Sequence, residues 1–298
     1  MRRIYFLIVL LILAVPTAQA FDFGGTLKDA VKEGITEAGK TDVSTEESAK
    51  PTNTETAGKQ TLNLKSPSEA EEIKIGREIV GNLLGAAPLV KDAALQKYVN
   101  QVGRWVANQS ERADWSWHFG VIDSEDINAF ASPGGYVIIT KGLYRKLENE
   151  AQLAGVLAHE IAHVVRAHHL QILQKTQLLD LGADLLGRQI GGDNQIIKKV
   201  IGSGAEICAR SLDKSAEFEA DRMGVTLSAR AGYEPYGLPD VLQTIGQTSK
   251  EDSTVALLFK THPHPDERLV KLDLAIGNRL DNLPNGKTLE KRFYKLKN

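Results

Sequence analysis

Four histidines and one glutamate lie in LAGVLAHEIAHVVRAHH, residues 153–169, whose other members are nearly all apolar. His159 and His163 are four residues apart, so on a helix both imidazoles project from one face, about 6 Å apart along the axis. Two such nitrogens can bind one zinc ion. Glu160 is rotated by about 100° and would lie beside the ion, as the general base for zinc-bound water. The alternative is a core helix with buried polar groups, which would be costly without partners.

A catalytic zinc ion needs a third protein ligand, and one candidate is a later histidine. His169 follows His159 by ten residues, as in the metzincin pattern H-E-x-x-H-x-x-G-x-x-H, whose glycine lets the chain leave the helix. Here Arg166 takes the glycine position and Ala167 follows it, and both residue types favour a helix. A continuing helix would turn His168 and His169 away from the zinc. We therefore expect neither to bind it, and interpret both as polar residues near the helix end, where a cationic imidazole suits the dipole.

The other candidate is a carboxylate in SAEFEADRMG, residues 215–224. Glu217 and Asp221 are four residues apart and share a helix face, whereas Glu219 is rotated by about 200° from Glu217. The spacing favours Glu217 as the third ligand. Asp221 would then accept the free N–H of a ligating histidine and fix its tautomer. A solvated acidic helix face is the alternative interpretation of the same spacing.

Further histidines occur in THPHPDERL, residues 261–269. A zincin needs a group that faces the metal and stabilises the oxyanion, and His262 and His264 are the unassigned histidines downstream of Glu217. Each precedes a proline, which holds the preceding residue extended. His264 lies close to the start of the expected last helix, where the positive end of the dipole disfavours a charged imidazole. The residues alone also allow a plain loop turn.

The elements that must position these residues follow from the period of the apolar side chains. Helical spacing and start signals predict helices at about 69–85, 88–108, 142–170, 171–190, 194–207, 213–231, 235–248 and 266–280. Strand patterns occur at 115–122, 127–131 and 136–140, with the turn SPGG before the last. The predicted fold class is α+β, mostly helical, with one small, mainly antiparallel β-sheet beside the active-site helix.

The strand at 127–131, with Asn128, Ala129 and Phe130, lies just upstream of the histidine helix in sequence. An exposed edge there could pair with an extended substrate by β-addition and present its scissile carbonyl to the zinc. An ordinary hairpin that packs into the core is the alternative.

The motifs together resemble the HtpX and CAAX-prenyl-protease family of zinc metallopeptidases. VLAHEIAHVVRAH and EFEADRMG, some fifty residues apart, are similar to its two signatures, and INAFASPGGYVIITKGLY and THPHPDERL extend the resemblance to about residues 69–275. The resemblance implies a zincin-type metalloprotease domain and a set of site residues: His159, His163 and Glu217 as zinc ligands, Glu160 as the base, and Asp221 in contact with a ligand.

The same resemblance places the histidine of the T-H-P sequence, His262, near the zinc. Two roles are open: His262 stabilises the oxyanion, or it is a fourth zinc ligand that keeps the enzyme latent until substrate displaces it. Membrane-embedded members of the family carry several spanning helices, and none is expected here after residue 20. The chain thus resembles the soluble, exported BepA/LoiP-like branch of periplasmic proteases.

The N-terminus has the layout of a cleavable secretory signal. Residues 1–20 comprise a basic start, an apolar run of twelve residues and an A-x-A site at the end. The run is shorter than the about 20 residues of a membrane span. We expect the mature chain to begin at Phe21, in the periplasm rather than secreted. The remaining organisation is predicted as an N-terminal segment and flexible polar linker at 21–66, the zinc metallopeptidase domain at 67–281 and a C-terminal tail at 282–298.

The composition argues against some classes of function. A net charge of -2 without a basic stripe gives no electrostatic case for binding nucleic acid, and the single cysteine, Cys208, excludes an intrachain disulfide. The predicted function is a zinc endopeptidase, with one zinc ion per chain, that cleaves unfolded or misassembled envelope proteins. A chaperone or assembly factor with low or latent proteolysis and a zinc amidase acting on cell-wall peptides are the alternatives. Peripheral contact with the envelope assembly machinery is also expected.

Overall fold

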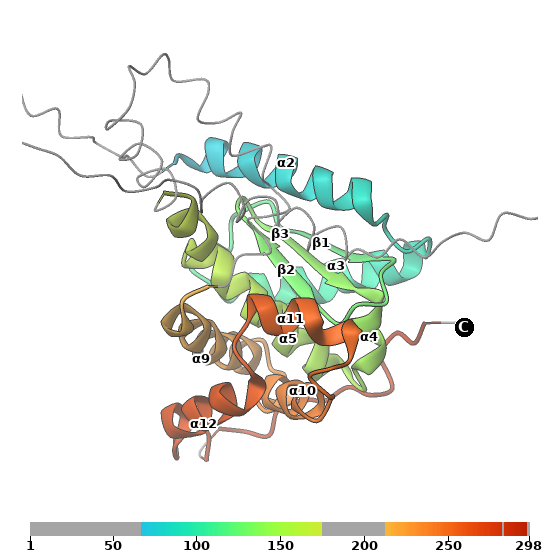
Figure 1. Cartoon of the computed structure of the whole chain (residues 1–298). Helices are drawn as coiled ribbons and strands as arrows, with labels where there is room; N and C mark the ends of the chain where they lie inside the picture. The colour runs from blue at the N-terminus through green and yellow to red at the C-terminus, as the bar shows by residue number, and fades with distance from the viewer. Residues whose placement is uncertain (1–66, 175–211, 282, 297–298) are drawn as a thin grey trace, which may run out of the picture.

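The computed structural model describes residues 67–174, 212–281 and 283–296 (Figure 1). Its helices and strands are α2 (Glu69–Ala86), α3 (Ala93–Ala107), β1 (His118–Ile122), β2 (Ala129–Ser132), β3 (Tyr136–Thr140), α4 (Lys141–Lys146), α5 (Glu150–Val165), α9 (Lys214–Arg230), α10 (Gly237–Gly246), the 3-10 helix η1 (Ser253–Val255), α11 (Ala256–Thr261) and α12 (Pro265–Ile276). The described part of the chain contains no helix that is both long and apolar enough to cross a bilayer. Outside the described residues lie the predicted signal, the linker, Cys208 and most of the predicted helices at 171–190 and 194–207.

The predicted α+β class, mostly helical with one small sheet, is confirmed. The strand order is β1-β3-β2, with β3 antiparallel to β2 and parallel to β1. The predicted hairpin is therefore present, and its turn contains Gly134 and Gly135 at φ 76° and 88°, which residues with a side chain rarely adopt. The sheet is therefore mixed, with one pair of each kind, and not mainly antiparallel as predicted, because the chain crosses from β1 to the far edge before β3 fills the middle. β2 is consequently an edge strand.

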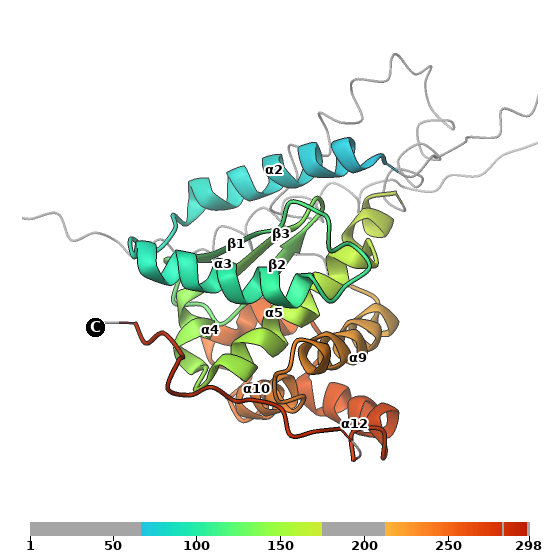
Figure 2. The same ribbon diagram turned by 180° about the vertical axis from the view of Figure 1, so that it is seen from behind.

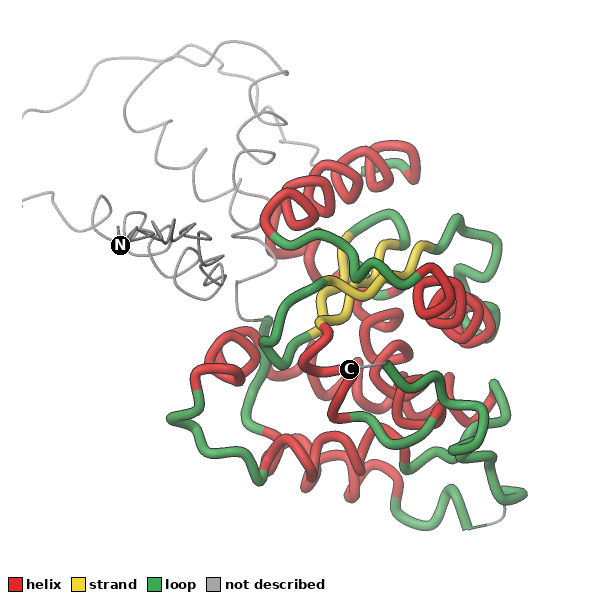
Figure 3. The backbone as a smooth tube through the Cα atoms, turned by 90° about the vertical axis from the view of Figure 1, so that its right-hand side faces the viewer, coloured by secondary structure: helices red, strands yellow, loops and turns green. Residues whose placement is uncertain are grey.

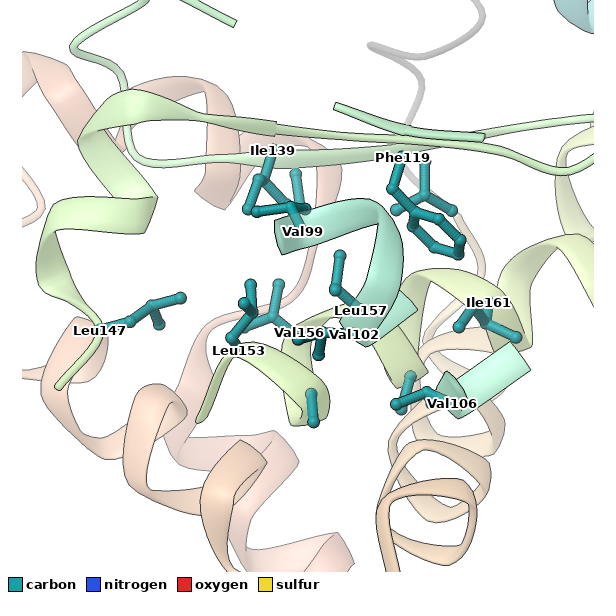
Figure 4. Packing of buried hydrophobic residues seen from close by; sticks show 14 of the residues in the cluster. Val99, Val102, Val106, Phe119, Ile139, Leu147, Leu153, Val156, Leu157 and Ile161 are labelled. Atoms are coloured by element: carbon teal, nitrogen blue, oxygen red, sulfur yellow. The ribbon is translucent and has the colours of Figure 1, made fainter. Parts of the chain in front are cut away.

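The sheet lies between α2 on one side and α3 and α5 on the other (Figures 2 and 3). Side chains from the inner face of the sheet meet apolar side chains of α3 and α5 in the main core (Figure 4). Every residue of α5 is buried, because the sheet, α3, α9 and α10 all pack against it. The helix that carries the two predicted zinc-binding histidines is thus the centre of the molecule.

The predicted single helix at 142–170 is wrong, because two breaks divide it. The side chain of Asn149 accepts a hydrogen bond from the backbone N–H of Gln152 at 2.9 Å and starts α5 as an N-cap. α5 ends at Val165, and Ala167 takes a left-handed φ of 54° before residues 168–174 become helical again. The helix predicted from residue 88 begins later, at Ala93, where Asp92 caps it with two hydrogen bonds.

A close contact brings α9 beside α5. A Cβ atom on Gly224 would lie only 3.1 Å from the backbone nitrogen of His159, so a larger residue there would require the neighbouring backbone to shift slightly. This approach lets the short carboxylate side chains of α9 reach the imidazoles of α5.

Candidate metal centre

The two histidines of α5 face each other as their spacing predicts. The Nε2 atoms of His159 and His163 are 3.0 Å apart, and both side chains are buried. Two nitrogens bound to one tetrahedral zinc at about 2.05 Å would be separated by about 3.3 Å. Burial holds the pKa of His163 well below its usual value, so this imidazole is neutral and can bind a metal ion.

Glu217 on α9 approaches both rings. Its Oε1 lies 3.5 Å from Nε2 of His163, and its Oε2 lies 3.7 Å from Nε2 of His159. Burial alone would raise the pKa of this carboxyl, but the charge and hydrogen bond of His262, together with the charge of Arg268, outweigh it and hold the pKa well below its usual value. The side chain is therefore a buried carboxylate, and its Oε1 has no hydrogen-bond partner among the described residues.

His262, at the end of α11, completes the group. Its Nδ1 is 2.8 Å from Oε2 of Glu217, and its ring centroid is 5.6 Å from that of His159. One ligand atom from each of four residues lies within 4.8 Å of the others: His159, His163, Glu217 and His262. An orphaned carboxylate oxygen amid three imidazoles fits a metal ion, because the ion would supply the partner that the oxygen lacks. His264, the other candidate, caps α12 instead.

Asp221, one turn after Glu217 on α9, makes the contact that its predicted role requires. Its Oδ1 lies 3.0 Å from Nδ1 of His159, the nitrogen remote from the other imidazole. Sequence reasoning missed the partner of Asp221, which is Arg268 on α12. The guanidinium donates from Nη2 to Oδ1 at 2.6 Å and from Nε to Oδ2 at 3.0 Å. The arginine is 4% exposed and thus fixes Asp221 from inside the protein.

His168 and His169 lie nearer the centre than a continuing helix would place them. The left-handed turn at Ala167 returns the chain, so that Nδ1 of His168 is 2.9 Å from Nδ1 of His163, while the ring of His169 meets that of His163 edge to face at 5.8 Å between centroids. Burial lowers the pKa of both imidazoles, to about 4 for His169. The expectation of cationic histidines at a helix end is therefore wrong. Neither belongs to the four-residue group.

Glu160 lies on the side of α5 that faces the edge strand. It lines a cavity of ≈ 10 Å³ together with Ala129, Phe130 and Ala131 of β2 and with His262. Burial raises the pKa of the Glu160 carboxyl, a change that makes it a stronger base. Ala129 and Phe130 of the predicted edge line the cavity beside this carboxyl, but both are buried, whereas an exposed edge was expected. Asn128 precedes β2, and its Oδ1 accepts the N–H of Ala129.

This arrangement of a HExxH helix, a carboxylate on a later helix and a small sheet is that of a metallopeptidase. The chain belongs to Peptidase family M48, whose model matches residues 93–276. Membership confirms the family predicted from the motifs and the class of enzyme, a metalloprotease.

Three relatives are similar over 59–68% of the chain. The chain is 32% identical to the "Beta-barrel assembly-enhancing protease" of Yersinia pestis over 206 residues, and this match covers 67% of this chain and 42% of that protein. The protein of the same name in Escherichia coli K12 is 31% identical over 209 residues, 68% of this chain and 43% of its own length. The "Mitochondrial metalloendopeptidase OMA1" of Schizosaccharomyces pombe is 26% identical over 176 residues, 59% of this chain and 51% of its own. The chain thus spans less than half the length of the assembly-enhancing proteases it matches.

Proposed function

We propose that the chain is a zinc-dependent endopeptidase with one zinc ion per chain, held by His159, His163 and Glu217. The observation that carries this proposal is the convergence of these three buried side chains, including the orphaned oxygen of Glu217, beside the cavity that contains Glu160. Zinc is favoured among metals because two imidazoles and one carboxylate are a ligand set of catalytic zinc sites.

A bound zinc ion would supply Lewis-acid chemistry, polarising the scissile carbonyl and lowering the pKa of water. Glu160 accepts the proton of the attacking water and delivers it to the leaving amine. Its buried carboxyl, with a raised pKa, suits both transfers. Asp221 orients His159 through the contact at Nδ1, and Arg268 orients Asp221.

The edge strand β2 supplies the substrate-binding groups. The backbone N–H of Thr140 donates to the carbonyl of Asn128, and the backbone N–H of Asn128 donates to the hydroxyl of Thr140. Because the direction of the backbone groups alternates along a strand, those of Ala129 and Ala131 point away from β3. The side chain of Asn128 occupies the N–H of Ala129. The carbonyl of Ala129 and both backbone groups of Ala131 are therefore the positions where an extended peptide pairs beside Glu160.

A second candidate function, an assembly factor or chaperone with latent proteolysis, is favoured by the closed geometry of the site. The cavity of ≈ 10 Å³ has room for about one water molecule and not for a peptide. The side chain of His262, which is hydrogen-bonded to Glu217, closes this cavity. With a zinc ion bound, His262 would act as a fourth ligand that substrate must displace, whereas in an open state the same imidazole would stabilise the oxyanion.

The substrates we propose are unfolded or misassembled envelope proteins, reached in the periplasm after cleavage of the signal at residues 1–20. Support comes from the layout of that segment and from the names of the bacterial relatives, which concern assembly of β-barrels. Backbone pairing along β2 requires no fixed sequence, which suits substrates of this kind. Contact with the envelope assembly machinery is part of the same proposal.

The test is Glu160→Gln, which removes the base but keeps the size of the side chain. We expect unchanged zinc content and folding and a loss of about 10²–10⁴-fold in hydrolysis of an unfolded protein such as casein. The same variant, incubated in an envelope extract, should retain envelope polypeptides that the wild type releases. Hydrolysis at the wild-type rate would refute the mechanism, and trapped cell-wall peptides instead of proteins would favour an amidase.

A further inference from the structure

His168 is a buried histidine that the proposed mechanism does not use. Ala167, the residue before it, has a φ of 54°, a conformation that costs a residue with a Cβ about 1–3 kcal/mol and persists only where the surroundings impose it. The turn brings the His168 side chain to 5% exposure with its Nδ1 2.9 Å from Nδ1 of His163. The molecule thus holds a strained backbone that places one imidazole against another.

The positions of the protons on His163 and His168 follow from the geometry of the proposed metal site. Nε2 of His163 faces Nε2 of His159 at 3.0 Å and Oε1 of Glu217 at 3.5 Å, so this nitrogen must present a lone pair to a metal. A neutral imidazole has one N–H, which must then be on Nδ1. The acceptor of this N–H is Nδ1 of His168. Its own proton is therefore on Nε2, which lies 3.6 Å from a carboxylate oxygen of Glu219.

We propose that His168 is a positioning residue that fixes the tautomer and ring orientation of His163 by accepting the hydrogen bond from its Nδ1. Glu219 favours the matching tautomer of His168, and Arg166 holds Glu219 through an ion pair of 3.0 Å. This inference rests on the proposed metal site. His168 supports His163 as Asp221 supports His159, but its acceptor is a neutral imidazole in place of a carboxylate.

The experiment compares zinc affinity in three variants of the mature full-length chain, by competition with a chelator at one pH. His168→Leu removes the acceptor, and we expect zinc to bind about 10–100-fold more weakly. His168→Asn keeps an oxygen acceptor near the position of Nδ1, and its affinity should stay close to that of the wild type. His169→Leu is the matched control, because the ring of His169 makes only an edge-to-face contact with that of His163. Thermal unfolding of the zinc-free proteins measures folding separately.

A purely structural role would lower the unfolding temperature of the zinc-free protein without this pattern of affinities. Equal zinc affinity in His168→Leu and wild type overturns the inference, as does an equal loss in His168→Leu and His168→Asn. Nitrogen-15 NMR of the zinc-loaded wild type gives a test that needs no folded variant: His168 should be protonated on Nε2, and protonation on Nδ1 would overturn the inference. If Glu217→Ala binds zinc as tightly as the wild type, the proposed metal site itself has failed.

Discussion

Replacing Arg268 by methionine tests how the metal centre is supported. The guanidinium and the carboxylate of Asp221 are 5% and 1% exposed, so the ion pair is buried from solvent. Methionine keeps most of the side-chain volume and removes the cation, which leaves the carboxylate buried with His159 as its remaining partner. Removing one partner of such a pair costs about 3–5 kcal/mol of unfolding free energy. For a domain of this size we expect the unfolding temperature of the metal-free protein to fall by about 6–20 °C.

The loss of stability in Arg268→Met should depend on pH in a defined direction. Burial raises the pKa of Asp221, but the charge and hydrogen bonds of Arg268 outweigh it and hold the folded-state pKa well below its usual value. A depressed pKa contributes stability that is present above the unfolded pKa of about 4 and is lost as the pH falls below it. The difference between wild type and Arg268→Met should therefore be full at neutral pH and shrink in acid.

A double variant separates stability from metal support. In Asp221→Leu/Arg268→Met the buried charge is gone, so most of the stability should return, but zinc affinity should stay about 10–100-fold weak because His159 has lost its acceptor. Lys214→Met is the matched control, because its ion pair with Glu267 is 64% and 43% exposed and contributes at most about 1 kcal/mol. If Arg268→Met unfolds at the temperature of Lys214→Met, or if the double variant recovers full zinc affinity, the reasoning is refuted.

Three further outcomes are expected. Glu217→Ala should lose zinc by elemental analysis while Glu219→Ala keeps it, and the reverse would show that the wrong helix face was chosen. His262→Ala should lower casein hydrolysis if the imidazole stabilises the oxyanion and raise it if the imidazole blocks the site; an unchanged rate contradicts both roles. Glu150→Gln should lower unfolding free energy by about 1–3 kcal/mol, because this buried carboxylate accepts from two tyrosines and one arginine at the start of α5. The exposed Glu148→Gln is its control in the same thermal assay, and an equal effect of both would remove that explanation.

Helix geometry made part of the site predictable from the sequence. The spacing of His159 and His163 places both imidazoles on one face, and the choice between Glu217 and Glu219 follows from the turn angle alone. In the structure Glu217 is fully buried among the imidazoles, whereas the Glu219 side chain is 44% exposed. The antiparallel hairpin was predictable for a similar reason, because SPGG supplies the two glycines that its turn requires.

Contacts between distant segments were not predictable in this way. Arg268 reaches Asp221 across 47 positions, and in the sequence the arginine is one charged residue in the first turns of a helix. No local spacing relates the two. The parallel pairing of β1 with β3 is likewise a matter of chain path, since the strand pattern predicts the strands but not the order in which they lie side by side.

The end of α5 shows how packing overrides local preference. Arg166 and Ala167 are good helix formers, and from propensity alone the helix continues and turns His168 away from the metal. Ala167 instead takes the left-handed conformation, at a cost that the surrounding structure must offset. The rejection of His168 as a ligand nevertheless still agrees with the structure, for a different reason: its Nδ1 meets the nitrogen of His163 that is remote from Glu217. A glycine at residue 167, the position with the positive φ, would have been a visible signal for such a return, whereas the alanine there is not, so this contact could be found only from the folded chain.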